Sequence, residues 1–205
     1  MLVRFLSTSD TLKADTNGWP VLQAAAWAEN RSGACPVAFQ VTERITTMTQ
    51  RQCGPCTKCC EGWVTAKING VSIVPLKPCA FLTNKGCGVY EKRPPVPCRS
   101  FKCGWLSDSS PLPEHMSPVN CGAIILFDRK WQGRTIISAL PTGPKIPQET
   151  LDWLMAYAQE KNIPLRWFEN VFKDNAFFGR NQIGFGPPAF VEAVKNAVTK
   201  NDLFM

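Results

Sequence analysis

Hydrophobic and polar residues alternate most clearly in two stretches, each of which surrounds a turn. Residues 63–76, WVTAKINGVSIVPL, contain two short β-branched runs on either side of Asn69-Gly70, a dipeptide that suits a type I′ hairpin turn. Residues 121–140 repeat this arrangement around a polar turn that contains Gly133. The pattern predicts a β-hairpin in each stretch.

The apolar residues take a helical spacing after Pro147 and again after Pro188. The first stripe consists of Leu151, Leu154, Met155 and Ala158, and the second of Phe190, Val194, Ala197 and Val198. Apolar residues three and four positions apart lie on one face of a helix, so we predict two C-terminal helices that turn these stripes toward the core. GFGPP at 184–188 has too few glycines for a phosphate-binding loop, and it predicts a turn before the last helix.

Residues 1–47 differ from the remainder of the chain. They have four basic and four acidic residues, one cysteine and little periodicity. We interpret them as a poorly patterned extension, and 48–205 as a cysteine-cluster metal-binding domain with an α+β C-terminal half. A chain that starts at Met48 is therefore expected to retain its metal.

The composition is that of a globular protein. The 205 residues are 44% hydrophobic, which is enough for a core. No apolar run approaches the ~20 residues of a membrane span, and the N-terminal residues lack the features of a signal peptide. We therefore predict a cytoplasmic protein that does not cross a membrane.

The chain has ten cysteines, and eight of them lie within 51 positions. In a reducing cytoplasm such density favours metal ligation over disulfides. We predict metal ligands at Cys53, Cys56, Cys59, Cys60, Cys79, Cys87, Cys98 and Cys103. Cys35 and Cys121 lie outside this pattern, and Cys121 is expected to be a small buried hydrophobic residue.

Cys53-Gly54-Pro55-Cys56 also has the spacing of a thioredoxin redox pair. That motif normally follows a buried strand and begins a helix, whereas the residues before Cys53 are polar. Eight thiolates are more than the four that bind one zinc ion or one iron–sulfur cluster. Two four-ligand sites or one polynuclear site fit this number, and the spacing does not distinguish zinc from iron–sulfur.

The net charge is +7. Between Cys53 and Cys103 eight basic residues face two acidic ones, which accounts for +6 of the total. Thiolate–metal sites carry negative charge, so we interpret these cations as compensation rather than as a surface for nucleic acid. Arg93 and Arg99, next to predicted ligands, are expected to steady the thiolates.

The cysteine motifs resemble a known family. CGPCTKCC, then PCAFL and GCGVYEKRPPVPCRSFKC, resemble the YkgJ-family cysteine-cluster proteins, also described as a zinc- or iron-chelating domain, to which flagellin lysine-N-methylases are related. The family elements fall on the first seven predicted ligands, with Tyr90, Arg93, Pro94 and Arg99 as companions. One extra residue lies between Pro94 and Cys98, compared with the family pattern.

This resemblance implies binding of zinc or of an iron–sulfur cluster. We expect an iron–sulfur protein with an electron-transfer or oxidoreductase role, which would need a redox or protein partner. The alternatives are a zinc-binding structural or interaction module and a protein-modifying enzyme related to the lysine-N-methylases. No catalytic residue or methyl-donor site is predicted, and His115, the only histidine, is expected to be solvated in its loop.

Overall fold

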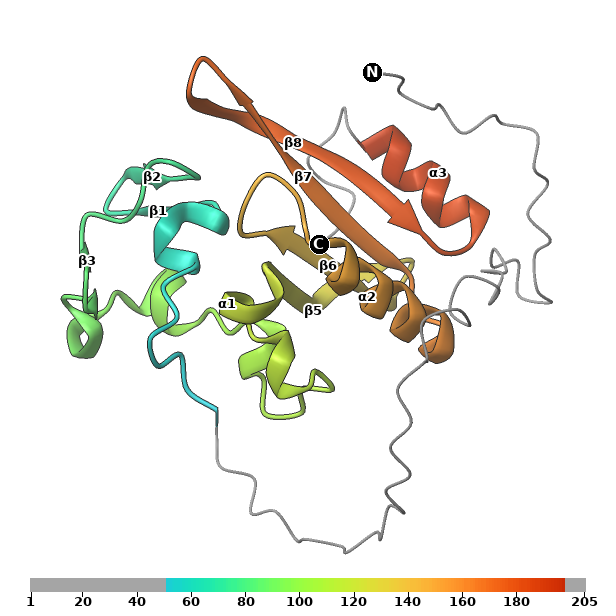
Figure 1. Cartoon of the computed structure of the whole chain (residues 1–205), viewed down its shortest axis with the longest axis horizontal. Coiled ribbons are helices and arrows are strands. Elements are labelled where there is room, and N and C mark those ends of the chain that lie inside the picture. Colours follow the sequence, from blue (N-terminus) through green and yellow to red (C-terminus); the bar gives the residue numbers. More distant parts are fainter. Residues whose placement is uncertain (1–50, 198–205) are drawn as a thin grey trace, which may run out of the picture. The chain divides into compact units, whose positions relative to one another are not determined.

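The computed structural model describes residues 51–197. These belong to one compact unit, Gln50–Met205, which combines helices and β-sheets in a mixed α+β fold (Figure 1). The predicted extension at 1–47, Cys35 and Val198 lie outside the described residues, so their predictions stay untested.

The first predicted hairpin is confirmed. Strands β1 (Ala66–Ile68) and β2 (Val71–Ile73) pair in antiparallel fashion. Asn69 and Gly70 connect them with φ values of +49° and +79°. Positive φ at both central positions is what a type I′ turn requires.

The second predicted hairpin is also confirmed, and it forms half of the main sheet. Strands β5 (Ala123–Trp131) and β6 (Arg134–Pro141) are antiparallel. Their turn, Gln132-Gly133, again has positive φ at both residues. The first four residues of β5 and the last six of β6 are buried, so this hairpin forms the centre of the core.

The other half of the sheet is a hairpin that the sequence pattern did not reveal. Strands β7 (Leu165–Lys173) and β8 (Ala176–Phe185) are antiparallel, and β7 runs parallel to β6. The sheet order is β5-β6-β7-β8, and Figure 1 shows β7 and β8 extending as a long twisted ribbon. Most β8 residues are partly exposed, so buried and exposed positions do not alternate clearly along this strand.

Both predicted helices are confirmed, and the unpredicted β7–β8 hairpin lies between them in the chain. Helix α2 (Gln148–Lys161) connects β6 to the parallel strand β7, and α3 (Pro188–Asn196) follows β8. Leu154, Ala158, Phe190, Val194 and Ala197 are buried, as the two stripes predicted, whereas Leu151 and Met155 are partly exposed.

The cysteine-rich part contains mainly short elements. Besides β1 and β2 these are η2 (Cys59–Trp63), β3 (Leu82–Thr83), β4 (Gly86–Cys87), η3 (Tyr90–Lys92), η4 (Pro95–Arg99), η5 (Gly104–Leu106), η6 (Glu114–Met116) and α1 (Pro118–Cys121). Such short elements bury little apolar surface of their own, so this part depends on contacts with the sheet and among its loops.

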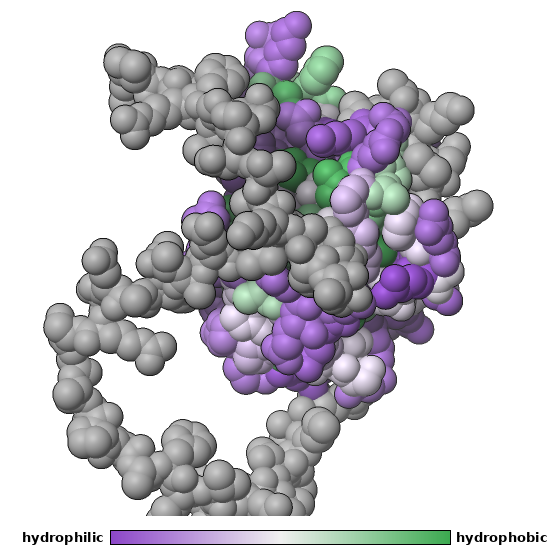
Figure 2. Space-filling view, turned by 90° about the vertical axis from the view of Figure 1, so that its right-hand side faces the viewer, coloured by the Kyte–Doolittle hydropathy of each residue, from purple (hydrophilic) through white to green (hydrophobic). Residues whose placement is uncertain are grey.

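The surface carries both hydrophilic and hydrophobic residues. Figure 2 shows one face, on which hydrophilic residues cover most of the described surface and smaller hydrophobic areas lie between them. Val96 and Phe178 are the most exposed large hydrophobic residues in the described range, at 74% and 73%.

Candidate functional site

The CGPC segment forms a turn. The Cys56 N–H donates to the Cys53 carbonyl at 2.9 Å, and Gly54 between them has a φ of +50°. The next element is the short helical turn η2, which contains Cys59 and Cys60. The long helix that begins at the second half of a thioredoxin motif is not found at this position.

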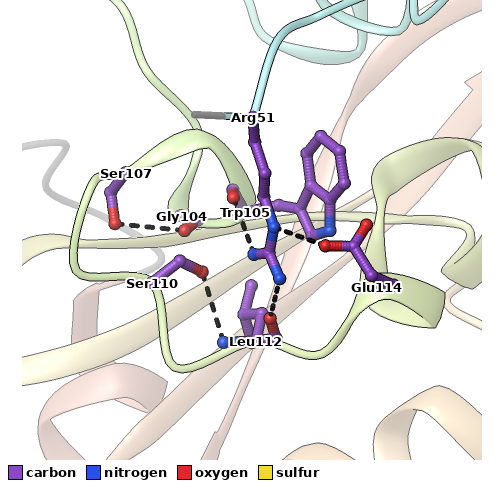
Figure 3. Close-up of polar contacts among 7 residues, drawn as sticks. All are labelled: Arg51, Gly104, Trp105, Ser107, Ser110, Leu112 and Glu114. Atoms are coloured by element: carbon purple, nitrogen blue, oxygen red, sulfur yellow. Dashed lines mark hydrogen bonds and ion pairs between the residues drawn. The ribbon is translucent and has the colours of Figure 1, made fainter. Parts of the chain in front are cut away.

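Arg51 attaches the start of this segment to the loops after Cys103 (Figure 3). Its Nε lies 2.7 Å from a carboxylate oxygen of Glu114, and its two terminal nitrogens donate to the carbonyls of Trp105 and Leu112 at 3.0 and 2.9 Å. The guanidinium carbon also lies 4.9 Å from the centre of a Trp105 ring. One arginine therefore joins segments more than fifty residues apart, and no sequence signal indicated this.

Glu61 stabilises the turn that contains Cys59 and Cys60. Its carboxylate accepts hydrogen bonds from Thr57 Oγ1, Lys58 Nζ and Trp63 Nε1 at 2.6 to 2.9 Å. Partial burial acts to raise the pKa of Glu61, but the three donors outweigh it and the pKa is lowered. The carboxylate is thus held in its charged form as an acceptor for its own turn.

Cys59 and Cys103 lie against the main sheet. Cys103 is 5% exposed and belongs to a core cluster with Ile124, Leu126 and Leu140, and Cys59 packs against this cluster. These three apolar residues come from β5 and β6. The central hairpin therefore supports two of the predicted ligands.

Arg180 makes a second connection between the sheet and the cysteine segment. From β8 it donates to the Trp63 carbonyl at 2.8 Å and to Asn170 Oδ1 at 2.9 Å. Burial lowers the pKa of Arg180 to about 10. This contact spans 117 positions of the chain, and sequence analysis missed it because β8 itself was not predicted.

The predicted ligands Cys79, Cys87 and Cys98 lie in the segment that follows β2. The Cys79 N–H donates to the Cys60 carbonyl at 2.8 Å, and the Cys79 carbonyl accepts from Leu82 N–H at 3.0 Å. Leu82 is paired with Cys87 across β3 and β4. Cys98 lies in η4, whose residues contact β1.

The predicted ligands act electrostatically on one another. Burial raises the pKa of five of their thiols, and neighbouring thiols raise each of these further; the five are Cys53, Cys59, Cys60, Cys98 and Cys103. For Cys60 the pKa reaches about 11. All nine cysteines in the described residues are free thiols. Each of the eight predicted ligands is therefore a free thiol that lies within electrostatic range of at least one other.

These thiols are neighbours without being arranged as ligands. Within residues 51–197, no group of three or more histidine, cysteine, aspartate or glutamate side chains could hold a metal ion as placed. The donor set nevertheless consists of thiols, which are the ligands of structural zinc and of iron–sulfur clusters. The chemistry of the residues fits such a centre, and the ligand assignments stay predictions.

The companion arginines of the motif make different contacts. The Arg93 charge lowers the pKa values of Cys53 and Cys98 against the larger effect of burial. Its guanidinium carbon lies 3.6 Å from the centre of the Tyr90 ring. Arg99 donates to the Glu91 carbonyl at 2.7 Å. Arg93 is thus the arginine whose charge reaches two predicted ligands.

Two other sequence predictions are confirmed. Cys121 is 5% exposed, and its thiol donates weakly to the carbonyls of Met116 and Ala123, both at 3.3 Å. His115 is exposed, and its ring meets Trp153 edge-on with 6.5 Å between the ring centres.

Comparisons with models of known protein families, with curated proteins and with solved structures gave no match. The resemblance to the cysteine-cluster family thus rests on the quoted motifs. Among the helices of residues 51–197, none is long and apolar enough to cross a membrane.

Proposed function

We propose that this protein binds metal through cysteine thiolates, and that the metal is held as iron–sulfur. The observation that carries the proposal is that eight free thiols come from separate segments and each lies within electrostatic reach of at least one other. The family-like motif CGPCTKCC with its later cysteines supports the same conclusion.

Metal binding requires thiolates, whereas burial favours the protonated form of a thiol that has no metal bound. The raised pKa values of the buried predicted ligands keep these thiols protonated near neutral pH, and a metal ion reverses this because it binds the thiolate and releases the proton. Metal binding would have to draw the thiols closer together. The Arg93 charge would offset part of the negative charge that then forms.

A redox role follows from iron–sulfur chemistry, because such clusters transfer single electrons. Cys98 and Cys60 are partly exposed, so a centre that includes them would lie near the surface. We propose electron transfer or an oxidoreductase activity with a protein partner in the cytoplasm, and we assign no catalytic residue.

A zinc-binding structural module is the second candidate. It is favoured by the short elements of the cysteine-rich part, where β1 to β4 have only two or three residues each. Small regions with little core are commonly stabilised by structural zinc.

The test is purification without oxygen from cells supplied with both iron and zinc. Iron–sulfur protein should be brown and should contain iron together with acid-labile sulfide, whereas zinc is colourless because its d shell is full. Colourless protein with stoichiometric zinc would select the second candidate. Protein that contains neither metal, yet is folded by circular dichroism, would refute the proposal.

A further inference from the structure

We infer that a cavity between the cysteine-rich part and the end of the β7–β8 hairpin is the docking site of an acidic protein partner, which inserts an apolar side chain into it. The inference rests on the proposed function, because it describes the partner which that function requires. The docking cavity has a volume of about 450 Å³. It is lined by Trp63, Leu76, Pro144, Phe172, Asp174 and Asn175.

Hydrogen bonds hold two walls of the docking cavity together. The Asn170 N–H donates to the Pro144 carbonyl at 2.8 Å, and the Asn170 side-chain oxygen accepts from Arg180 Nε at 2.9 Å. Arg180 also donates to the Trp63 carbonyl at 2.8 Å. Asn170 is buried, so water does not compete strongly for these bonds. The Trp63 and Pro144 walls are therefore connected, and the cavity is formed before a partner binds.

Leu76 is a residue that its own backbone conformation disfavours. Two backbone hydrogen bonds between Val74 and Lys77, at 2.8 and 3.2 Å, close a turn in which Pro75 is second and Leu76 third. Leu76 has a φ of +67°, and turns with positive φ at the third position prefer glycine or asparagine there. The leucine is also 61% exposed, so it adds little to the core. Coverage by a partner gives this exposed apolar residue a role.

The openness of the docking cavity favours a protein over a small molecule. Four of its six lining residues are exposed. A small molecule would stay largely in water there, whereas binding sites for small molecules bury most of the ligand. A side chain inserted by a protein fits better, because the remainder of the partner covers the opening. The Trp63 and Phe172 walls favour an aromatic or aliphatic side chain.

The charges around the docking cavity favour an acidic partner. Lys77 and Lys173 are sequence neighbours of lining residues, both are exposed, and neither forms an ion pair within residues 51–197. They outnumber Asp174, the acidic residue of the lining. Between Cys53 and Cys103 eight basic residues face two acidic ones. A surface with this balance attracts acidic proteins and speeds their association.

Trp63 connects the docking cavity to two predicted ligands. It is the last residue of η2, which contains Cys59 and Cys60, and its indole Nε1 donates to the Glu61 carboxylate at 2.9 Å. A partner that contacts Trp63 would therefore lie beside the turn of the cysteine pair. This position suits electron exchange between the partner and a centre formed by these thiols.

The test measures binding of short labelled peptides to the full chain by fluorescence anisotropy, in protein purified without oxygen. A peptide with a central phenylalanine and glutamates on both sides should bind about tenfold more tightly than the same peptide with a central alanine, which cannot fill the cavity. A phenylalanine peptide with lysines in place of the glutamates should bind more weakly at low salt, and added salt should reduce this difference.

Leu76→Gly separates docking from folding. Glycine adopts positive φ without strain, so the variant should unfold at no lower urea concentration than the wild type. It should nevertheless bind the phenylalanine–glutamate peptide about tenfold more weakly, because one apolar wall is removed. The control Val119→Ser changes another exposed apolar residue, outside the lining, and should bind as the wild type does. Lys77→Glu should weaken binding at low salt.

The outcomes separate the docking site from the metal-binding function. Equal binding of the phenylalanine and alanine peptides, or unchanged binding by Leu76→Gly, would overturn the docking site even in a protein that contains metal. Binding of a short single-stranded DNA in place of the peptides would assign the positive charge to nucleic acid and overturn the choice of partner. Peptide binding as expected by a folded chain without any metal would support the docking site and refute the metal-binding function.

Discussion

Replacing Gly62 by alanine tests whether close backbone packing holds the cysteine pair in place. Gly62 lies within η2, next to its last residue, is buried, and has a φ of +92°. An added Cβ would overlap the Val74 carbonyl group and lie 3.0 Å from the Pro75 nitrogen. Both neighbours are backbone atoms, so neither can turn aside as a side chain could.

The matched control is Gly70→Ala in the β1–β2 turn. Gly70 also has a positive φ, +79°, but an added Cβ would meet nothing within 4 Å. The left-handed conformation costs about 1–2 kcal/mol for alanine at either position. Overpacking adds about 1–3 kcal/mol at Gly62 alone. We therefore expect a loss of about 2–5 kcal/mol for Gly62→Ala and about 1–2 kcal/mol for Gly70→Ala.

Urea unfolding followed by circular dichroism measures both free energies of unfolding. Gly62→Ala should also reduce the metal content, because η2 contains Cys59 and Cys60, whereas Gly70→Ala should not. Equal free energies of unfolding for the two variants, or full metal content in Gly62→Ala, would show that contact with Val74 does not position the cysteine pair.

Three further substitutions test the supports of the site. Arg180→Met should lower the free energy of unfolding by about 2 kcal/mol because the Trp63 carbonyl loses a charged donor. The control, Arg129→Met, removes an exposed ion pair at 3.6 Å and should change this free energy by less than about 0.5 kcal/mol. Similar losses for the two variants in urea unfolding would contradict the prediction. Arg51→Lys should lower the free energy of unfolding by about 1–2 kcal/mol, because lysine cannot reproduce the three directed hydrogen bonds of the guanidinium group. An unchanged free energy of unfolding would show that Arg51 does not anchor the start of the cysteine segment. Burial raises the pKa of Cys121 from 9.0 to about 11, so the folded and unfolded thiols are both protonated below pH 9, and only the unfolded one ionises as the pH rises toward 11. Stability should therefore fall by about 2 kcal/mol over that range, and Cys121→Ala should remove this part of the fall. An unchanged pH dependence would show that the thiol is not buried in this way.

Local sequence signals predicted the elements that depend on neighbouring residues. Asn69-Gly70 and Gly133 lie in the turns they indicated, since positive φ is a preference of the residue itself. The first apolar stripe and the start of the second, Phe190 and Val194, likewise lie on helices. In the β7–β8 hairpin the available signal was Asp174-Asn175, both with positive φ, but the partly exposed strands beside it lack clear alternation.

The sequence by itself carried the prediction of thiolate chemistry, because the number, type and spacing of the cysteines point to thiolate ligation without any structure. Only the tertiary structure decided which thiols are neighbours. Cys103 reaches Cys59 through packing on β5 and β6, and Arg180 reaches Trp63 from a strand 117 positions away. Such contacts depend on burial and hydrogen bonding between distant segments, which spacing along the chain does not encode.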